Sequence, residues 1–289
     1  REFKPDAYWL HTITFTPNAF ERFIFKSRKP KVVTYHTMVE EYGRIYAGLV
    51  GAKTMRIRSK SVCNNADAVI IPSQMMKDRV SEYVTTPIEV IPTGIVIPKD
   101  QFSRDEICER FKIDSKSKLL LYVGRISKEK NLEFLLEALK RVNRAKMDAT
   151  LLFVGPGDLD EMREIAQEMG IGSKTVFTGG LAKEEAQRIY GGADLFVFSS
   201  QTETQGLVIG EAMAAETPVF ALKSPIQKEV YPEEVAIISS DLTEFVEKLI
   251  ETLNNLEGTK KMVERAKTFV DDNFSEELMI EKQIKVFER

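Results

Sequence analysis

The sequence is poor in the residues that build metal centres and disulfide frameworks. Its 289 residues include two cysteines, Cys63 and Cys108, which lie far apart and show no metal-ligand spacing. This pattern argues against a structural zinc site, and it suits a reducing cytoplasm better than a disulfide scaffold. The chain also lacks a run of 18 apolar residues and a recognisable signal peptide, so nothing in it is expected to cross a bilayer or direct export.

The distribution of charge gives little support for nucleic-acid binding. The net charge is −3, and no basic stripe with stacking aromatic residues occurs. The charge is uneven, however, because residues 1–99 carry 15 Lys and Arg against 9 Asp and Glu, whereas the remainder has a net charge of −9. Since the length also predicts about two domains, we expect two halves that face different partners.

A stretch rich in structure-breaking residues marks the seam between these halves. Pro92, Gly94 and Pro98 interrupt regular structure there, so we expect domains at 1–98 and 99–272, followed by a terminal segment at 273–289. After the seam, apolar strands near 119–123, 150–154, 175–178, 194–198 and 218–221 alternate with helical patterns. This alternation predicts βαβ units around a parallel sheet. Before the seam, strands near 7–10, 31–35 and 68–71 and helices near 18–28 and 39–64 predict half of a Rossmann-like domain.

Two glutamates, Glu203 and Glu211, lie eight positions apart. On one helix they would lie about 12 Å apart along the axis and about 80° apart around it, so they could not share a compact site. We therefore expect Glu203 on the loop after the strand at 194–198, and Gly206 at the start of a helix that carries Glu211 in its second turn. Backbone N–H groups near Gly206 and Leu207 would then face an anion. The arrangement suggests a phosphate between two hydroxyl-binding carboxylates, as in a nucleotide sugar.

A pair of cations follows the apolar strand at 119–123. Arg125 offers a planar fork suited to phosphate oxygens and Lys130 a compact point charge, so together they can neutralise a diphosphate leaving group. The alternative is that Arg125 and Lys130 are merely solvated loop charges. The Glu203–Glu211 stretch also lies at a strand-to-helix junction, and the presence of two such groups favours a phosphate-binding site. The glycines of Gly155–Gly157 fit a phosphate loop or a tight turn equally well, and Asp158 is expected to cap a helix.

These segments resemble the retaining glycosyltransferases of the GT-B fold, which include glycogen synthases, sucrose synthases and bacterial lipid glycosyltransferases. The resemblance runs over nearly the whole chain and is carried by GRISKEKN at 124–131, LLFVGPGDL at 151–159, VFTGGL at 176–181 and SSQTETQGLVIGEAMAAETPVFA at 199–221. It implies an α/β fold of two Rossmann-like domains facing a cleft, with a helix at 273–289 that returns to the first domain. One departure is Glu216, where the family usually has glycine.

The resemblance also implies roles for individual residues. Arg125 and Lys130 would bind the diphosphate, Glu211 the ribose hydroxyls, and Glu203 with the following backbone the donor sugar. The implied substrate-binding positions are Gly124, Leu181, Thr204, Gln205, Gly206, Leu207 and Glu211.

The first half is expected to be incomplete. It opens at Arg1 without an initiator methionine, near what should be the middle of the family's first domain, and a molecule that truly began there would be of doubtful activity. His36 ends a strand at the sheet edge where α/β ligands gather, although a lone histidine there is more often structural. The resemblance implies that His36 faces the donor sugar near the reacting carbon, whereas His11 is expected to be structural.

The stretch from Tyr35 to Tyr42 most resembles the family members that add an α-glucosyl unit to diacylglycerol. Basic and apolar side chains are interspersed behind it, namely Arg44, Lys53, Arg56, Arg58 and Lys60 with Ile45, Tyr46, Leu49, Val50, Met55 and Ile57. Such a segment is predicted to lie on an anionic membrane, at around 1 kcal/mol per basic side chain. A helix packed on its own sheet with a solvated basic face is the alternative.

These features together predict a retaining hexosyltransferase that moves glucose from UDP-glucose to diacylglycerol without a metal or other cofactor. We expect it in the cytoplasm, peripheral to the inner face of the membrane. Front-side attack by the acceptor is preferred, because a nucleophilic Glu203 would need a partner acid at about 5 Å that the sequence does not identify. A transferase with a soluble sugar or glucan acceptor and a non-catalytic nucleotide-sugar-binding remnant remain open.

Overall fold

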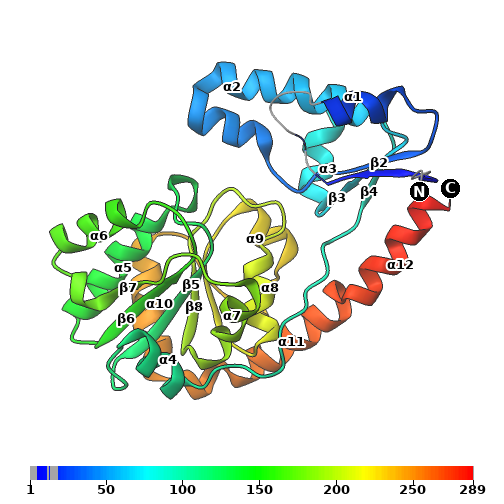
Figure 1. Cartoon of the computed structure of the whole chain (residues 1–289). Helices are drawn as coiled ribbons and strands as arrows, with labels where there is room; N and C mark the ends of the chain where they lie inside the picture. The colour runs from blue at the N-terminus through cyan, green and yellow to red at the C-terminus, as the bar shows by residue number, and fades with distance from the viewer. Residues whose placement is uncertain (1–4, 12, 14–18, 289) are drawn as a thin grey trace. The chain divides into compact units, whose positions relative to one another are not determined.

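The computed structural model describes residues 5–11, 13 and 19–288, and the chain divides into two compact units (Figure 1). The first unit comprises residues 1–93, 202–205 and 277–289, and the second comprises 94–201 and 206–276. The division between residues 93 and 94 therefore lies inside the seam expected at 92–98, a few residues before the expected domain boundary at 98. Within the described ranges, no helix combines the length and apolarity that crossing a bilayer requires.

The first unit contains a four-stranded parallel sheet in the order β1-β2-β3-β4. Its strands are β1 (Tyr8–Leu10), β2 (Lys31–Thr34), β3 (Ala68–Ile71) and β4 (Ile88–Val90), and its helices are α1 (Ala19–Lys26), α2 (Val39–Asn64), α3 (Gln74–Ser81) and most of α12 (Glu276–Phe287). β3 is a continuous apolar run, as expected for a strand covered by helices on both faces of the sheet, whereas β2 includes Lys31 and β4 includes Glu89. Val33 and Val69 pack toward α2 and α3, whereas Val32 and Ile70 pack with Met279 of α12.

The second unit contains a six-stranded parallel sheet in the order β10-β9-β8-β5-β6-β7. Its strands are β5 (Lys118–Val123), β6 (Ala149–Val154), β7 (Thr175–Phe177), β8 (Leu195–Phe198), β9 (Val219–Leu222) and β10 (Ile237–Ser239). Its α-helices are α4 (Arg104–Phe111), α5 (Leu132–Arg144), α6 (Leu159–Glu168), α7 (Lys183–Arg188), α8 (Leu207–Ala214), α9 (Pro225–Val230), α10 (Leu242–Asn254) and α11 (Lys260–Phe274). Its 3₁₀ turns are η1 (Lys128–Lys130), η2 (Gly172–Lys174), η3 (Tyr190–Gly192) and η4 (Leu256–Thr259).

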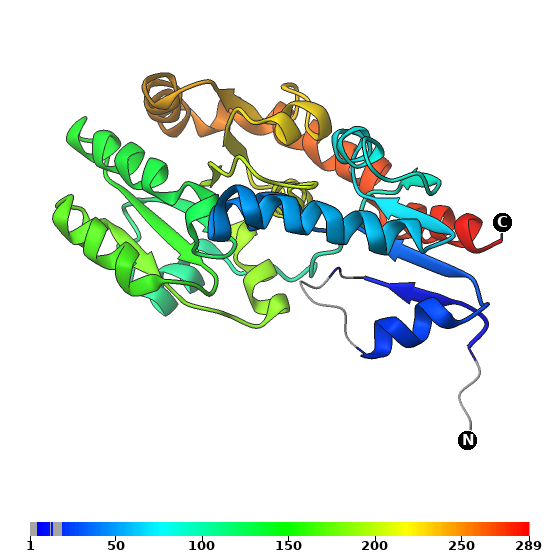
Figure 2. The same cartoon turned by 90° about the horizontal axis from the view of Figure 1, so that it is seen from above.

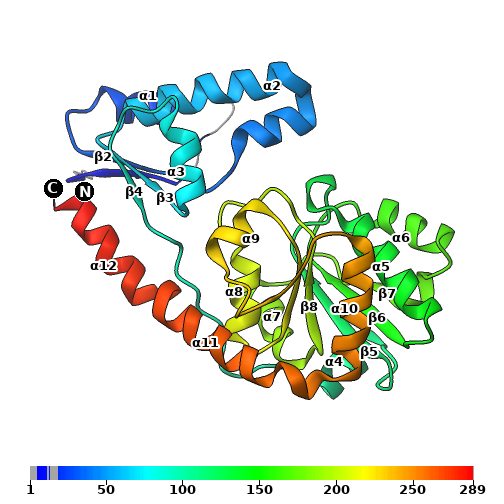
Figure 3. The same cartoon turned by 180° about the vertical axis from the view of Figure 1, so that it is seen from behind.

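The helices of this unit form a layer on each face of the sheet. On α5 the predicted apolar stripe of Leu132, Leu135, Leu136, Leu139 and Val142 is buried. That stripe belongs to a core shared with α6 and α10, and α5 and α10 lie side by side over the sheet (Figure 3). A second core joins α4, α8 and α11 to the opposite face. The alternation of strands and helices read from the sequence is thus confirmed as a doubly wound parallel sheet.

The strand order reverses between β5 and β8. From β5 the chain proceeds to β6 and β7 on one side, and from β8 it proceeds to β9 and β10 on the other. In open α/β sheets the loops diverge at such a point and leave a crevice outside the carboxyl ends of the two strands, where ligands bind. The topology therefore selects the loops after β5 and β8 as the first place to look for a site.

Candidate functional site

The two sequence motifs of the second unit meet at this reversal. Gly124 and Arg125 directly follow β5, and the chain leaving β8 leads into α8. The two strands pair in register, Leu120 with Leu195 and Leu121 with Phe196. The fold therefore brings motifs that are about 80 positions apart in the sequence to one edge of one sheet, as a ligand spanning both of them requires.

The predicted phosphate ligand Arg125 is oriented by a buried carboxylate. Its Nη2 lies 3.0 Å from Oε1 of Glu129, and Oγ of Ser127 donates to the same oxygen at 2.7 Å. The Glu129 side chain is fully buried, whereas half of the Arg125 side chain is exposed. Burial opposes ionisation, but the Ser127 hydroxyl, a backbone N–H group and the positive charges of Arg125 and Lys130 outweigh it and lower the pKa of Glu129. An ionised carboxylate beneath the surface thus holds an exposed guanidinium.

The other predicted cation, Lys130, ends η1 rather than starting a helix directly. Asn131 follows it with φ of +55°, and α5 begins only at the next residue. The buried hydroxyl of Ser199, just after β8, donates to the carbonyl oxygens of Lys130 and Asn131, each at 2.9 Å. Ser199 therefore ties the cation loop after β5 to the end of β8.

The glycines after β6 allow two loops to approach closely. Gly155 has φ of +146°, and a Cβ on it would lie 2.0 Å from the carbonyl oxygen of Gly124. The backbone N–H of Ile126 donates to the carbonyl of Pro156 at 2.8 Å. Of the two interpretations of Gly155–Gly157, a phosphate loop or a tight turn, these contacts support the tight turn. Asp158 accepts a hydrogen bond from the backbone in the first turn of α6, so the predicted cap is confirmed.

Glu211 lies in the second turn of α8, as expected, and both of its carboxylate oxygens accept hydrogen bonds. Nε2 of Gln187 donates to Oε1 at 2.7 Å, and the hydroxyl of Tyr190 donates to Oε2 at 2.9 Å. Gln187 and Tyr190 are both buried. Burial and then the negative charge of Glu211 raise the pKa of Tyr190 well above its ordinary value, so the phenol remains a donor.

The start of α8 is built for a close backbone approach. Gly206 precedes it in the left-handed conformation, with φ of +74°, and the Tyr231 hydroxyl donates to its carbonyl at 3.1 Å. In the described part of the chain, no side chain caps this helix start by a hydrogen bond. Its first N–H groups can therefore serve an anion. Leu207 is partly exposed, and Leu181 lies between β7 and α7, packed against the core.

The predicted sugar-facing residue of the first unit is His36, two positions after β2. It lines a cavity of about 180 Å³ together with His11, Thr34 and Tyr42. The rings of His36 and His11 stack with centroids 5.8 Å apart, and His11 follows the neighbouring strand β1, as expected. Burial, and then the charge of His11, lower the pKa of His36, so the neutral imidazole is favoured.

Residues 202–205, which include Glu203, group with the first unit. Within this unit the hydroxyl of Thr204 donates to the carbonyl of His36 at 2.9 Å. The Gln205 amide is buried and pairs at both ends with the backbone of Thr93, at 2.8 and 3.0 Å. Gln205 therefore has a structural role that the sequence did not indicate, in addition to the substrate contact inferred for it.

Helix α2 consists of two helical arms rather than one continuous helix (Figures 1 and 2). Non-helical dihedral angles at Ala47 and Gly48 separate the arms. A Cβ on Gly51 would lie 2.2 Å from the carbonyl oxygen of Gly43, so the arms touch backbone to backbone next to the bend. Tyr46, Leu49 and Val50 lie at this bend with 64%, 77% and 77% of their surface exposed. We call these three residues the α2 tip.

Not every residue of the predicted membrane segment faces outward. Met55 is fully buried, and the largely buried Arg58 side chain forms an ion pair with Glu21. These two residues were wrongly included, because helix periodicity alone does not show which face meets the sheet. Arg44, Lys53, Arg56 and Lys60 are exposed, as are Ile45 and Ile57.

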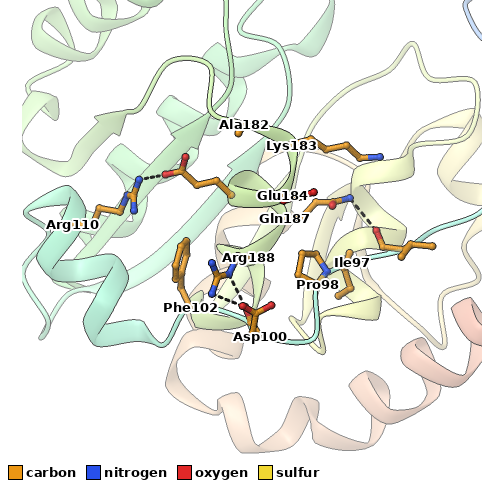
Figure 4. Close-up of a pocket in the computed structure, with 12 residues that line it drawn as sticks. Ile97, Pro98, Asp100, Phe102, Arg110, Ala182, Lys183, Glu184, Gln187 and Arg188 are labelled. Atoms are coloured by element: carbon orange, nitrogen blue, oxygen red, sulfur yellow. Dashed lines mark hydrogen bonds and ion pairs between the residues drawn. The ribbon is translucent and has the colours of Figure 1, made fainter.

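A cavity of about 760 Å³ lies beside α7 in the second unit (Figure 4). Among its charged lining residues, Arg188 pairs with Asp100 and Arg110 with Glu185. Gln187 projects from α7 toward Val96, whose carbonyl accepts its amide at 3.1 Å. Across the described residues, no group of three or more His, Cys, Asp or Glu side chains could hold a metal ion.

Sequence reasoning missed the residues that support the predicted site. Glu129 stands inside the recognised motif, but its burial is not visible from the motif. Ser199 is the first residue of the motif at 199–221, but that motif does not show its contact with the loop after β5. Gln187 and Tyr190 contact the site only through the fold, and no sequence signal distinguishes them.

Two family models match the chain. The family described as "Glycosyl transferases group 1" matches residues 103–269, and the family described as "Glycosyltransferase Family 4" matches residues 1–97. Alpha-monoglucosyldiacylglycerol synthase of Streptococcus pneumoniae is 35% identical over 208 residues, which cover 68% of this chain and 47% of that protein. A synthase of the same name from Acholeplasma laidlawii is 25% identical over 76% of this chain and 59% of that protein.

Other relatives act on different acceptors. D-inositol 3-phosphate glycosyltransferase of Corynebacterium jeikeium is 28% identical over 60% of this chain and 45% of that protein. The chain spans about half the length of the curated relatives it matches.

Two solved structures share the fold. Sucrose-phosphate synthase from Thermosynechococcus elongatus superimposes with a TM-score of 0.78 at 22% identity, covering 92% of this chain and 69% of that one. Anabaena HepE in complex with UDP and glucose gives 0.79 at 18% identity, covering 93% of this chain and 74% of that one. At these identities the likeness shows the fold alone, and it confirms the expected GT-B class.

Proposed function

Because the chain belongs to the glycosyl transferases of group 1, we propose that it is the donor-binding and catalytic part of a retaining hexosyltransferase that uses UDP-glucose and a diacylglycerol acceptor. The observation that carries the proposal is the meeting of two motifs at the strand-order reversal: a buried carboxylate orients Arg125 on one side, and Glu211 lies on α8 on the other. A site of that form offers cations and helix N–H groups to phosphates and a carboxylate acceptor to hydroxyls.

The chemistry follows from where charge develops. As the bond between the sugar's C1 and the diphosphate oxygen breaks, negative charge grows on the β-phosphate, and Arg125, Lys130 and the start of α8 stabilise it. The acceptor oxygen bonds to C1 on the same face, and its proton passes to the departing diphosphate. Glu203 holds the sugar hydroxyls and His36 orients the sugar. The proposal assigns no metal and no cofactor to this step.

The lipid acceptor is proposed on two supports. Two relatives, each called alpha-monoglucosyldiacylglycerol synthase, match 68% and 76% of the chain. The α2 tip also presents three exposed apolar side chains, and the exposed cation Lys53 follows it by three positions. Apolar side chains that enter the headgroup region, next to cations that attract anionic lipid, are the features of a surface that docks on a membrane. The protein would therefore work as a peripheral protein on the cytoplasmic face of an anionic membrane.

The donor site is tested by titrating the chain with UDP and by measuring UDP release from UDP-glucose with diacylglycerol in anionic vesicles, with and without EDTA. Glu211→Ala is expected to weaken UDP binding at least tenfold, and Lys130→Ala to lower the rate of transfer more than the affinity. The exposed residues Glu247 and Lys261 provide matched alanine controls. Unchanged binding and kinetics in both site variants would remove the proposed site, and loss of turnover with EDTA would contradict metal independence.

The acceptor is tested by sedimentation with vesicles of phosphatidylcholine, with and without phosphatidylglycerol. The double variant Leu49→Ser/Val50→Ser is expected to bind anionic vesicles at least tenfold more weakly, because each substitution removes an apolar side chain from the lipid contact. Ile284→Ser is the matched control, since Ile284 is a half-exposed apolar residue on α12. Turnover with soluble sugars and no vesicle binding would favour a soluble acceptor, and UDP binding without turnover would favour a non-catalytic remnant.

A further inference from the structure

Two buried side chains hold the carboxylate of Glu211, and neither belongs to a sequence motif. Gln187 is a buried residue near the end of α7, and Tyr190 is the first residue of η3, which follows α7. Their exposed fractions are 6% and 0%. One donates to Oε1 of Glu211 at 2.7 Å and the other to Oε2 at 2.9 Å, so each carboxylate oxygen has one internal donor.

The direction of the Gln187 amide is fixed by a second acceptor. The same Nε2 that bonds Glu211 also donates to the carbonyl of Val96 at 3.1 Å. Both acceptors require the NH₂ end of the amide, so the amide oxygen cannot face the carboxylate. The two bonds therefore fix the orientation of the Gln187 amide, with its NH₂ end toward Glu211.

Tyr190 is fixed by its surroundings. Its ring packs against Phe196 with centroids 5.6 Å apart, and its carbonyl accepts the hydroxyl of Thr217 at 2.7 Å. The phenol hydroxyl thus reaches Glu211 from a rigid core position. A glutamate on a helix surface would otherwise lose rotamer freedom when it binds a ligand, and prior fixation removes that cost.

The number of acceptor sites defines what Glu211 can still bind. An ionised carboxylate offers about four lone-pair positions, two on each oxygen. Gln187 and Tyr190 take one on each oxygen, which leaves one on each for an incoming donor. Two remaining acceptors, one on each oxygen of a carboxylate, match two hydroxyls on adjacent carbons, as in a ribose, better than they match a single hydroxyl.

We propose that Gln187 and Tyr190 are positioning residues that hold Glu211 for two vicinal ribose hydroxyls and thereby set a preference for ribonucleoside over deoxyribonucleoside diphosphates. This inference rests on the proposed function, since it assigns supporting residues to the same donor site. Neither side chain touches the nucleotide, so each acts through the carboxylate of Glu211.

The test compares the affinities of UDP, 2′-deoxy-UDP and 2′,3′-dideoxy-UDP for the 289-residue chain by calorimetry. The wild type is expected to prefer UDP to the dideoxy compound. Gln187→Leu and Tyr190→Phe are each expected to weaken UDP binding about tenfold while leaving the dideoxy compound unchanged, as Glu211→Ala should. Tyr83→Phe is the matched control, because it removes a buried tyrosine hydroxyl from the first unit and should keep the preference.

The outcomes separate the inference from the function beneath it. A wild type that prefers UDP, with Gln187→Leu and Tyr190→Phe variants that keep the full preference, would overturn the positioning role. An equal loss of affinity for all three nucleotides would also overturn it, because a general structural defect has no reason to spare the dideoxy compound. A wild type that binds UDP and dideoxy-UDP equally would instead overturn the role of Glu211 itself. Tyr190→Phe keeps the ring and the core contacts, so it tests the hydroxyl even where Gln187→Leu disturbs folding.

Discussion

Substitution of Gly155 by alanine is predicted to destabilise the second unit far more than the small size of the added methyl group suggests. Gly155 has φ of +146°, and its added Cβ would lie 2.0 Å from the carbonyl oxygen and 2.8 Å from the carbonyl carbon of Gly124. Real Cβ atoms essentially never come within 3.0 Å of such atoms, and both of these belong to the backbone, so no side chain can rotate away. The loop that carries Arg125 must therefore move by about 1 Å.

The cost has two parts. An L-residue held at this φ costs about 1–3 kcal/mol in backbone strain. Overpacking against atoms that cannot move freely adds about 1–3 kcal/mol. The two terms together predict that Gly155→Ala costs about 2–6 kcal/mol, a large share of a domain's total stability.

Gly170 provides the matched control in the same unit. It has φ of +74°, and nothing lies within 4 Å of an added Cβ, so Gly170→Ala carries backbone strain without overlap and should cost about 1 kcal/mol. Urea unfolding followed by circular dichroism measures both, and amide hydrogen exchange in β5 and β6 locates the loss. UDP affinity should fall for Gly155→Ala only. Equal destabilisation of the two variants, or full UDP affinity in Gly155→Ala, would refute the argument from close approach.

Two further predictions concern other parts of the chain. The pKa of His36, measured by NMR, should lie below the ordinary histidine value of about 6.5; the sequence has only two histidines, so their signals can be assigned. His11→Asn should raise the pKa of His36 only partly toward that value, because the burial of His36 remains. Because the pKa of His36 is lower in the folded state, its contribution to stability is complete above about pH 6.5 and is lost as the pH falls through the pKa of the folded state. His36→Asn should reduce this loss of stability at acid pH, and a measured His36 pKa above 6.5 would contradict the prediction. Glu216→Gly should be about 1 kcal/mol more stable to urea than Glu216→Ala, because both lose the exposed ion pair with Lys267 but only glycine accepts φ of +59° without strain; equal stabilities would show that this φ carries no strain.

The fold could be predicted well wherever local pattern and tertiary demand agree. The buried strands β3, β5, β6 and β8 each contain a run of four or more apolar residues, and each was located to within about two positions. Strands β4 and β10 were not predicted, although β1 and β7, which are also three residues long, were located. The bend in α2 also escaped notice, because Gly48 departs from helical geometry without any proline to mark the break.

The site was predictable as a set of residues but not as an arrangement. The motifs show a guanidinium at Arg125 and a carboxylate at Glu211, each in the segment that follows a predicted strand. The strand order of the folded sheet then places both at one edge of the sheet. The sequence does not show that residues 202–205 group with the first unit, or that Gln205 is engaged by the backbone of Thr93. Those contacts join segments more than 100 positions apart, and no local propensity encodes them.

The residues predicted from the sequence and the buried residues whose contacts are seen only in the structure are related in the same way at each position. Each predicted polar group of the second unit is held by a buried partner: Glu129 holds Arg125, Ser199 holds the backbone at Lys130, and Gln187 holds Glu211 together with Tyr190. A ligand-facing group must stay partly hydrated and exposed, so its own contacts with the ligand cannot fix its direction before the ligand arrives. The buried partner supplies that direction at folding, which lowers the ordering cost at binding. Donor affinity in this chain should therefore depend as strongly on the concealed partners as on the motif residues themselves.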